Sequence, residues 1–275
     1  MDDTDRRSEV ALAAARAGAA VASDRFRSDV AVETKDGKTD VVTQADRDAQ
    51  RAVVDSIREA YPGDPIVGEE DGQPGTVPES GPAWVVDPID GTNNYVRGVP
   101  LWATAVAAVR DGRPIAAGIV APELDDAYRA DDEAAYLNGR RVTVAERTDL
   151  DECTVVPTIW WNFDARDQYA AATGGIVRRF GDLRRIGCAQ LALATLAAGG
   201  IDGVFTNLRP NPWDSIAGCH VIRVAGGRVT DLNGDDWRHD ATGMIATSGP
   251  IHDEVLAVAR ETDAERDDPR VDGYR

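Results

Sequence analysis

Acidic side chains follow apolar runs at separate places in this chain. Ile66-Val67-Gly68 precedes one pair of acids, Trp84-Val85-Val86 precedes another, and a Pro-Trp-Asp-Ser-Ile-Ala-Gly segment holds a fifth; the five are Glu69, Glu70, Asp87, Asp90 and Asp214. Short apolar runs bounded by turn residues are typical of buried strands. Because an ionised carboxylate is costly to remove from water, acids at buried strand ends need a compensating cation. The pattern therefore predicts a fold in which these acids converge on bound metal.

The donor atoms indicate which metal. Oxygen ligands without histidine or cysteine favour Mg²⁺, Ca²⁺ or Mn²⁺ over zinc, and Mg²⁺ usually completes its shell with water and phosphate oxygens. A lysine counter-ion is not available nearby, because the only lysines are Lys35 and Lys38. The first interpretation is metal-assisted phosphate chemistry.

The segment from Asp87 to Thr92 combines metal ligands with an anion site. Asp87 and Asp90 can reach one side of a site, Pro88 ends strand pairing, and Gly91 permits close backbone approach. If Thr92 begins a helix, the amides of Gly91 and Thr92 favour phosphate at its N-terminus. This geometry suits two-metal hydrolysis. The alternative for this segment alone is an ordinary turn, since Asp-Gly and Asp-Pro pairs are common turn formers.

The charge balance excludes some partners. The chain has 48 acidic and 30 basic residues and a formal net charge of −18, which argues against binding a nucleic-acid polymer or an anionic membrane. Nearly all positive charge is arginine, and aspartate outnumbers glutamate. We interpret this bias as halophilic, because a dense carboxylate surface stays dispersed in molar salt. The alternative is an acidic protein from an ordinary environment.

Cysteine content and the absence of long apolar runs favour a cytoplasmic enzyme. Cys153, Cys188 and Cys219 are odd in number and lack close pairing, which suits a reducing compartment. The N-terminal residues contain no apolar run of signal-peptide length, and no stretch approaches the roughly 20 residues of a membrane helix.

The length and patterning predict two halves. Residues 1–147 are expected to form an α+β unit with most of the metal ligands, with helices at 8–22 and after Asp46, a polar loop at 29–43, and strands and hairpins from 101 to 144. Residues 148–262 are expected to form an α/β unit carrying Asp214, with strands at 154–157, 203–206, 228–232 and 244–247 and helices at 188–198, 215–225 and 251–260. Residues 263–275 are expected to be a frayed tail.

Three motifs together resemble the inositol monophosphatase family. They are Gly68-Glu69-Glu70, Asp87-Pro-Ile-Asp90-Gly-Thr92-Asn-Asn-Tyr95 and Trp213-Asp214-Ser-Ile-Ala217-Gly218. Asp40 to Thr43 with Asp46 is similar to the element that precedes them in the family. The resemblance spans most of the chain and implies a layered αβαβα fold with two subdomains, usually dimeric, that hydrolyses phosphate monoesters with two to three Mg²⁺ ions.

The resemblance also implies residue roles. Glu69, Asp87 and the carbonyl of Ile89 are expected to hold one metal, Asp87, Asp90 and Asp214 a second, and a looser ion is expected near Glu69. Thr92 and Asp46 are expected to orient and deprotonate the attacking water, so the expected catalytic set is Asp46, Glu69 and Thr92. Glu70 is not assigned as a direct ligand. The alternative for Asp214 is a helix N-cap, which is compatible with metal binding.

Substrate choice stays open. In inositol-specific relatives, a glutamate seven residues before the metal-binding aspartate contacts ring hydroxyls, and this position is Asn207 here. Asn207 can still hydrogen-bond hydroxyls, and Arg209 could face a second phosphate or a carboxylate. The phosphate-binding set is therefore expected to be Asp90, Gly91, Thr92, Asn207 and Arg209. Inositol 1-phosphate is the first substrate hypothesis, fructose 1,6-bisphosphate the second and adenosine 3′,5′-bisphosphate the third. A non-catalytic, metal-binding relative is the non-enzyme alternative.

An arginine pair and a tryptophan pair have two interpretations each. Arg184 and Arg185 either border the substrate, as the matching segment does in relatives, or form a solvated pair. Trp160 and Trp161 either line a pocket or fill the core. The three histidines are expected to be surface or packing residues.

Overall fold

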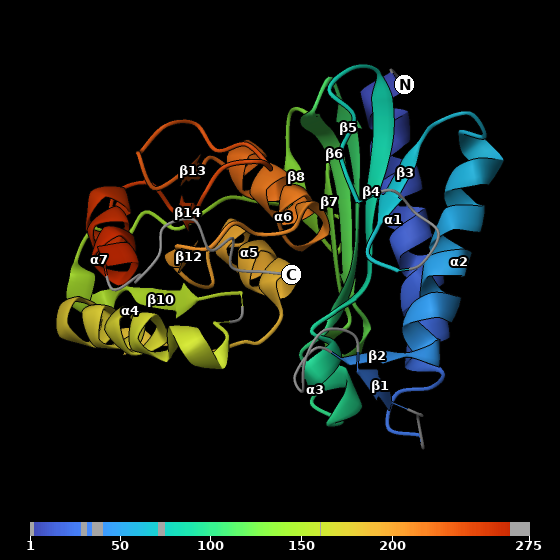
Figure 1. Ribbon diagram of the computed structural model, residues 1–275. Helices are drawn as coiled ribbons and strands as arrows, with labels where there is room; N and C mark the ends of the chain where they lie inside the picture. The colour runs from blue at the N-terminus through green and yellow to red at the C-terminus, as the bar shows by residue number, and fades with distance from the viewer. Residues whose placement is uncertain (1–2, 29–31, 35–40, 71–74, 160, 265–275) are drawn as a thin grey trace.

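The protein is built as five layers, αβαβα, as the motif resemblance implied (Figure 1). The computed structural model describes residues 3–28, 32–34, 41–70, 75–159 and 161–264. The first half contains α1 (Asp3–Ser23), β1 (Val32–Thr34), β2 (Val41–Thr43), α2 (Gln44–Ala60), β3 (Ile66–Gly68), β4 (Pro82–Asp90), α3 (Thr92–Val96), β5 (Ala103–Arg110), β6 (Arg113–Ala121), η1 (Pro122–Leu124), β7 (Asp126–Ala130), β8 (Ala135–Leu137) and β9 (Arg140–Val142).

The second half contains more helix than strand. It contains η2 (Leu150–Glu152), β10 (Thr154–Pro157), η3 (Phe163–Ala165), α4 (Arg166–Arg179), β11 (Asp182–Leu183), α5 (Ala189–Ala197), β12 (Gly203–Thr206), α6 (Pro212–Val224), β13 (Arg228–Thr230), β14 (Met244–Thr247) and α7 (His252–Ala264). Among the described residues, no helix is both long and apolar enough to span a bilayer.

Two sheets form the alternate layers. The larger has seven strands in the order β3-β4-β5-β6-β7-β8-β9, and only β3 and β4 in it are parallel. The smaller has five, in the order β11-β10-β12-β14-β13. Helices α1 and α2 cover the outer face of the larger sheet, α5 and α6 lie between the sheets, and α4 and α7 cover the outer face of the smaller one (Figure 1).

The larger sheet is buried on both faces, which is why its strands read as continuous apolar runs. In β5, Ala105 and Ala107 pack toward α5 and α6, whereas Val106 and Ala108 pack toward α1 and α2. Small residues allow α1 to lie close to the sheet. A Cβ atom on Gly118 of β6 would come within 2.5 Å of the backbone nitrogen of Leu12, so the helix rests on the strand backbone at this point.

An irregularity in β4 positions its acidic end. Pairing with β5 is regular up to Asp87 and resumes at Asp90, with a register shift between them. Pro88 has no amide hydrogen for the ladder, and its carbonyl instead accepts a hydrogen bond from the Thr104 hydroxyl at 2.7 Å. The irregular segment lets Asp87 and Asp90 face the same side of the sheet.

The elements differ from the sequence expectations in several places. α6 begins at Pro212 rather than 215, so Asp214 lies in its first turn and Asn211 is the N-cap residue. β1 and β2 pair within the expected polar loop, while residues 35–40 lie outside the described residues. α4 and β11 were not expected. The chain passes from the larger to the smaller sheet between Val142 and Thr154.

The end of the chain is only partly described. α7 continues to Ala264, so the first two residues of the expected tail are helical, and the Asp263 carboxylate accepts a hydrogen bond from Asn207 at 3.2 Å. Residues 265–275 lie outside the described residues.

Candidate metal centre

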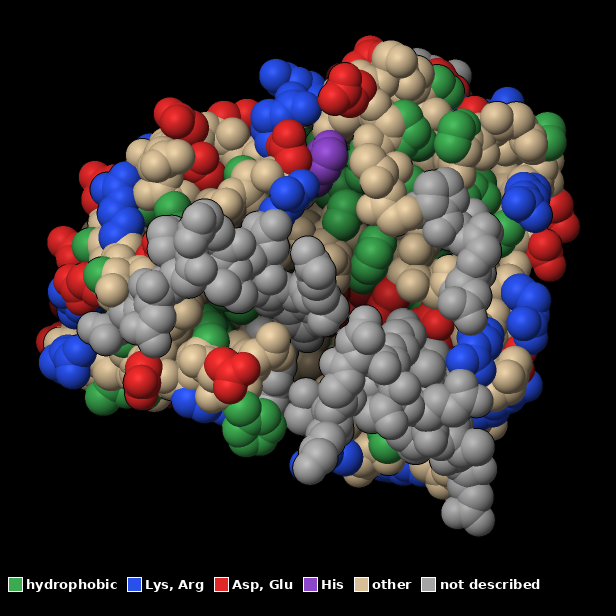
Figure 2. All heavy atoms as spheres, in the orientation of Figure 1, with side chains coloured by type: hydrophobic (Ala, Val, Ile, Leu, Met, Phe, Trp, Pro, Cys, Tyr) green, Lys and Arg blue, Asp and Glu red, His purple; other side chains and the backbone are tan. Residues whose placement is uncertain are grey.

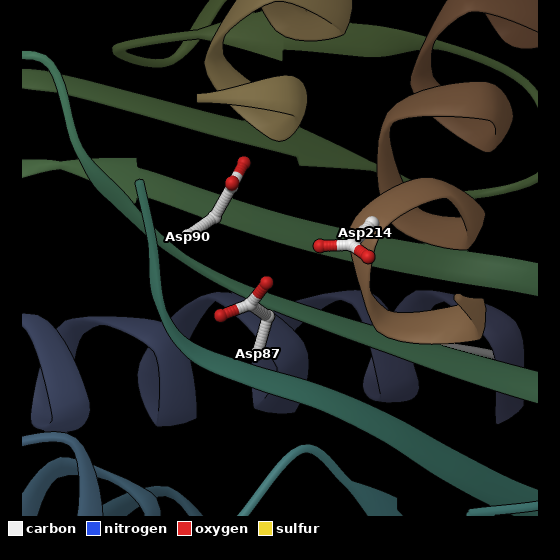
Figure 3. Close-up of side chains that lie close together, drawn as sticks. All are labelled: Asp87, Asp90 and Asp214. Atoms are coloured by element: carbon white, nitrogen blue, oxygen red, sulfur yellow. The ribbon is translucent and has the colours of Figure 1, made fainter. Parts of the chain in front are cut away.

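Three aspartates from two different layers converge at one point. Asp87 and Asp90 come from β4 and Asp214 from the first turn of α6, and one carboxylate oxygen from each lies within 4.8 Å of the others. Figure 3 shows Asp87 and Asp90 leaving β4 and Asp214 facing them from the first turn of α6. Asp87 and Asp90 are buried and Asp214 is half-buried. The cluster has the donor set and spacing of a site for a hard divalent cation.

Asp87 is the least compensated of the three. Its carboxylate is 1% exposed, and neither oxygen has a hydrogen-bond partner among the described residues. Burial raises its pKa well above the ordinary value, and the negative charges of Glu69, Asp90, Asp214 and Asp46 raise it further. Buried charges in folded proteins are normally paired or bound to metal. The orphaned oxygens therefore fit an ion held here.

Asp90 is more strongly held by the protein. Burial raises its pKa, and this effect is opposed by a hydrogen bond from the Cys188 thiol, at 3.1 Å, and by backbone amides at the start of α5. One of these amides is that of Gln190. The Gln190 side chain in turn accepts from the Gly218 amide of α6 at 2.8 Å. Asp90 is thus fixed by the helix layer that also carries Asp214.

A hydroxyl and a carboxylate lie beside the cluster, as the resemblance implied. The Thr92 hydroxyl is 3.4 Å from an Asp46 carboxylate oxygen and donates to the Ile89 carbonyl at 3.0 Å. Asp46 is 1% exposed and lies in the first turn of α2. The contact joins the outermost helix layer to the end of β4.

Gly91 is required by the shape of this turn. It caps α3 with φ of 89°, in the left-handed region. A Cβ atom there would lie 3.0 Å from the Leu101 carbonyl oxygen and 3.1 Å from the Cys188 Cβ. The Asn94 side-chain amide fixes the turn by donating to the carbonyls of Leu101, at 2.7 Å, and Ile186, at 2.9 Å. These contacts close the seam between the two halves.

The aspartates open onto a cavity of about 460 Å³. Its lining includes Glu69, Ile89, Asp90, Gly91, Thr92 and Asp214. The lining also includes arginines and aromatic rings: Arg97, Arg166, Arg185, Tyr169 and Trp213. Acidic side chains are visible in the hollow between the two halves in Figure 2. A ligand in this cavity would meet both carboxylates and guanidinium groups.

Two expected substrate residues lie elsewhere. Asn207 is fully buried: its carbonyl oxygen accepts from the Trp161 indole at 2.8 Å, and its amide donates to Gln168 at 2.6 Å. Arg209 is exposed, and neither residue lines the cavity. Asn207 is linked to the cavity through Trp161, whose ring stacks on the cavity residue Tyr169 at 5.1 Å between centroids. Trp161 is thus a core residue, and Trp160 lies outside the described residues.

Arg184, Arg185 and Glu70 occupy different environments. Arg185 lines the cavity, whereas Arg184 is exposed and pairs with Asp182. Glu70 is buried, and its backbone is bonded in both directions to the Gln50 side chain. Sequence reasoning missed Arg97, Arg166 and Tyr169. Arg97 could have been found from the sequence because it lies next to the Asp90–Tyr95 motif. Arg166 and Tyr169 belong to α4, which was not expected.

Comparison with known proteins decides the family. The sequence profile of the inositol monophosphatase family matches residues 3–264. The chain belongs to the inositol monophosphatase family. The match covers both halves and all three acidic segments, so the family resemblance carried by the motifs is confirmed.

Relatives in this family have different names. The chain is 36% identical over 235 residues to a fructose-1,6-bisphosphatase/inositol-1-monophosphatase of Thermotoga maritima, covering 84% of this chain and 86% of the relative. It is 35% identical over 244 residues to the Nus factor SuhB of Escherichia coli K12, covering 86% and 89%. The solved structure of a Thermotoga maritima IMPase superposes with a TM-score of 0.84 at 33% identity, covering 96% of this chain and 99% of that one.

Proposed function

We propose that this protein hydrolyses phosphate monoesters of small polyols or sugars with the help of Mg²⁺. The main supporting observation is the pair of buried Asp87 oxygens that lack a hydrogen-bond partner among the described residues; they lie beside Asp90 and Asp214, which line a cavity large enough for such an ester. The family supports the reaction class, and the donor set supports Mg²⁺.

The protein contributes oxygen ligands from two layers. Glu69, Asp87 and the Ile89 carbonyl would hold one ion, and Asp87, Asp90 and Asp214 a second, with Asp87 shared because the charges of Glu69, Asp90 and Asp214 all act on it. When bound, Mg²⁺ supplies positive charge to the phosphate oxygens and lowers the pKa of a coordinated water.

Asp46 and Thr92 are proposed to manage the proton of the attacking water. The Thr92 hydroxyl, which donates to the Ile89 carbonyl in the described arrangement, would turn its hydrogen toward Asp46, 3.4 Å away, and accept a hydrogen bond from that water. Because Asp46 is buried and has the hydroxyl beside it, it is placed to act as the base. The backbone at Gly91 and Thr92 lines the cavity and is proposed to receive the phosphate.

The substrate carries a polyol or sugar body. Inositol 1-phosphate is the first candidate because of the family. A sugar bisphosphate such as fructose 1,6-bisphosphate is the second, and one observation favours it: Arg97, Arg166 and Arg185 all line the cavity. Guanidinium groups there would suit a second phosphate.

A substrate panel with paired variants tests the proposal. Wild-type protein in molar KCl with Mg²⁺ should release phosphate from inositol 1-phosphate, fructose 1,6-bisphosphate or adenosine 3′,5′-bisphosphate. Thr92→Ala should reduce kcat by about 10²–10⁴-fold while Mg²⁺ binding persists. Asp87→Asn should remove both.

The opposite result has a definite meaning. Wild-type protein that binds Mg²⁺ but releases phosphate from none of the esters would favour the non-catalytic alternative, a metal-stabilised scaffold, which the relatives named Nus factor keep in consideration. Asp87→Asn with unchanged Mg²⁺-dependent turnover would remove the ligand assignment.

We also propose a setting for the enzyme: a homodimer in the cytoplasm of a salt-loving organism. The net charge of −18 and the near absence of lysine support the salt requirement, and three free buried cysteines are consistent with a reducing compartment. Circular dichroism during dilution from molar KCl tests the first point, with full structure in dilute buffer as the contrary result. Light scattering in molar KCl gives the oligomeric state.

A further inference from the structure

A buried glutamine joins the two elements that carry the aspartates. Gln190 is the second residue of α5 and is 0% exposed. Its backbone amide donates to a carboxylate oxygen of Asp90 at the end of β4. Its side-chain nitrogen donates to the Trp213 carbonyl at 2.5 Å, and its side-chain oxygen accepts from the Gly218 amide at 2.8 Å. Gln190 is therefore bonded both to Asp90 and to the backbone of α6.

The two contacts on α6 lie on either side of Asp214. Trp213 directly precedes this aspartate, and Gly218 follows it by about one helical turn. A side chain bonded to both therefore fixes the turn from which Asp214 projects. Asn211, the N-cap residue, adds a further restraint, because its side chain donates to the Asp214 carboxylate at 3.1 Å.

The close approach of α5 and α6 makes these contacts possible. The two helices lie side by side between the sheets (Figure 1). A Cβ atom on Gly218 would lie 2.4 Å from the Leu193 Cβ and 3.0 Å from the side-chain oxygen of Gln190. Because Gly218 has no side chain, the amide of Gln190 reaches the α6 backbone directly. A change at Gln190 is therefore passed to Asp214 through the helix that carries it.

A neutral amide suits this position. Asp87, Asp90 and Asp214 repel one another, since one oxygen of each lies within 4.8 Å of the others, and a movement of α6 would relieve that repulsion. An amide side chain offers a donor and an acceptor together and adds no charge to the cluster. Mg²⁺ demands near-ideal octahedral geometry with oxygens at about 2.0–2.1 Å. The separation between the ligand-bearing elements therefore controls how well the ion is held.

We propose that Gln190 is a positioning residue of the metal centre, which sets the separation of Asp90 from Asp214 and through it the affinity for Mg²⁺. Gln190 does not line the cavity and acts through the ligands on β4 and α6. The inference rests on the ligand assignment of the proposed function. It adds that the ligand geometry is fixed from α5, an element to which no metal ligand is assigned.

Calorimetric titration of Mg²⁺ into the full chain in molar KCl tests this role. Gln190→Met keeps the length of the side chain but loses both of its hydrogen bonds to α6. We expect about 10- to 100-fold weaker Mg²⁺ binding, the usual effect of removing a residue that orients metal ligands. The matched control is Gln168→Met, because Gln168 is a buried glutamine of α4 that accepts from Asn207 at 2.6 Å. This control should bind Mg²⁺ as wild type does.

Urea unfolding with EDTA or with Mg²⁺ separates positioning from general stabilisation. The loss of stability in EDTA measures the packing and the hydrogen bonds that each substitution removes. With Mg²⁺ at a hundred times the wild-type Kd, a tenfold weaker affinity lowers the stabilisation by the ion by about 1.3 kcal/mol. Gln190→Met should show this additional loss, whereas Gln168→Met should lose the same amount in both conditions.

A second variant keeps the test decisive. Gln190→Ala removes the same hydrogen bonds without a bulky replacement, and circular dichroism checks that each variant is folded. Unchanged Mg²⁺ affinity in a folded Gln190 variant, an equal loss of affinity in Gln168→Met, or loss of folding in both Gln190 variants overturns the inference while the proposed function stands. Wild type that takes up no Mg²⁺ overturns the metal centre, and the proposed function and this inference with it.

Discussion

The Asp87→Asn substitution should make the metal-free protein more stable while removing its response to Mg²⁺. The reason is the crowding of charge: oxygens of Asp87, Asp90 and Asp214 lie within 4.8 Å of one another, and both Asp87 oxygens lack a partner among the described residues. Two unit charges at this separation repel by about 3 kcal/mol at an effective dielectric constant of ~20. Protonation and relaxation relieve part of this, so we expect a gain of about 1–3 kcal/mol in the free energy of unfolding without metal.

The assay is urea unfolding followed by circular dichroism at fixed KCl, with EDTA or with Mg²⁺. Wild type should gain about 2.7 kcal/mol from Mg²⁺ at a hundred times its Kd, and Asp87→Asn should gain almost nothing. Asp55→Asn, the same change at an exposed position on α2, is the matched control and should behave as wild type in both conditions. If Asp87→Asn is less stable than wild type in EDTA, or keeps the Mg²⁺ stabilisation, the electrostatic reasoning is wrong.

Three further perturbations have expected outcomes. Gly91→Ala should lower the free energy of unfolding by about 1–3 kcal/mol and abolish turnover, because its φ of 89° and close neighbours exclude a Cβ, whereas Gly226→Ala, with φ of 94° in open space, should lose stability but keep kcat. Burial lowers the pKa of His220 from 6.5 to about 4, so between these pH values the unfolded chain binds a proton that the folded protein does not. The free energy of unfolding is therefore unaffected by this group above pH 6.5 and falls by about 1.4 kcal/mol per pH unit down to pH 4. Urea unfolding of His220→Gln at pH 7 and 5 should show a correspondingly smaller loss than wild type, and an equal loss would exclude this source. Asn207→Ala should cost about 1–3 kcal/mol by leaving the Trp161 indole without its acceptor, and an unaltered urea midpoint would contradict that account.

Four strands were predictable because they are short apolar runs between turn residues. β3, β10, β12 and β14 occupy the expected ranges 66–68, 154–157, 203–206 and 244–247. Burial on both faces gives such strands a continuous apolar signal that does not depend on distant partners. The family motifs supplied the layer order, which periodicity alone does not contain.

α4 was missed for a physical reason. It has Gly174-Gly175 in its interior and no strong apolar stripe, both of which argue against a helix in an isolated segment. Its glycine is needed by packing: a Cβ on Gly175 would lie 2.7 Å from a Val258 methyl carbon of α7. Tertiary contact overrides local propensity here, and with α4 the sequence reading also missed Arg166 and Tyr169 in the cavity.

Asn207 illustrates a limit of spacing along the chain. Its distance from Asp214 matched the position of a substrate-binding residue in relatives, but spacing does not determine the direction of a side chain. Trp161, remote in sequence, accounts for its environment by donating to its carbonyl oxygen. Such a pairing between distant residues is visible only in the folded structure.

Because the aspartates are divided between β4 and α6, the ion site can form only after both halves have folded and docked. Neither the strand nor the helix layer carries all three aspartates. A chain that has folded only one half therefore cannot bind the ion with all three, and its buried carboxylates repel one another. Metal uptake would then occur last, after the helix bearing Asp214 has docked, and would lock the docked arrangement.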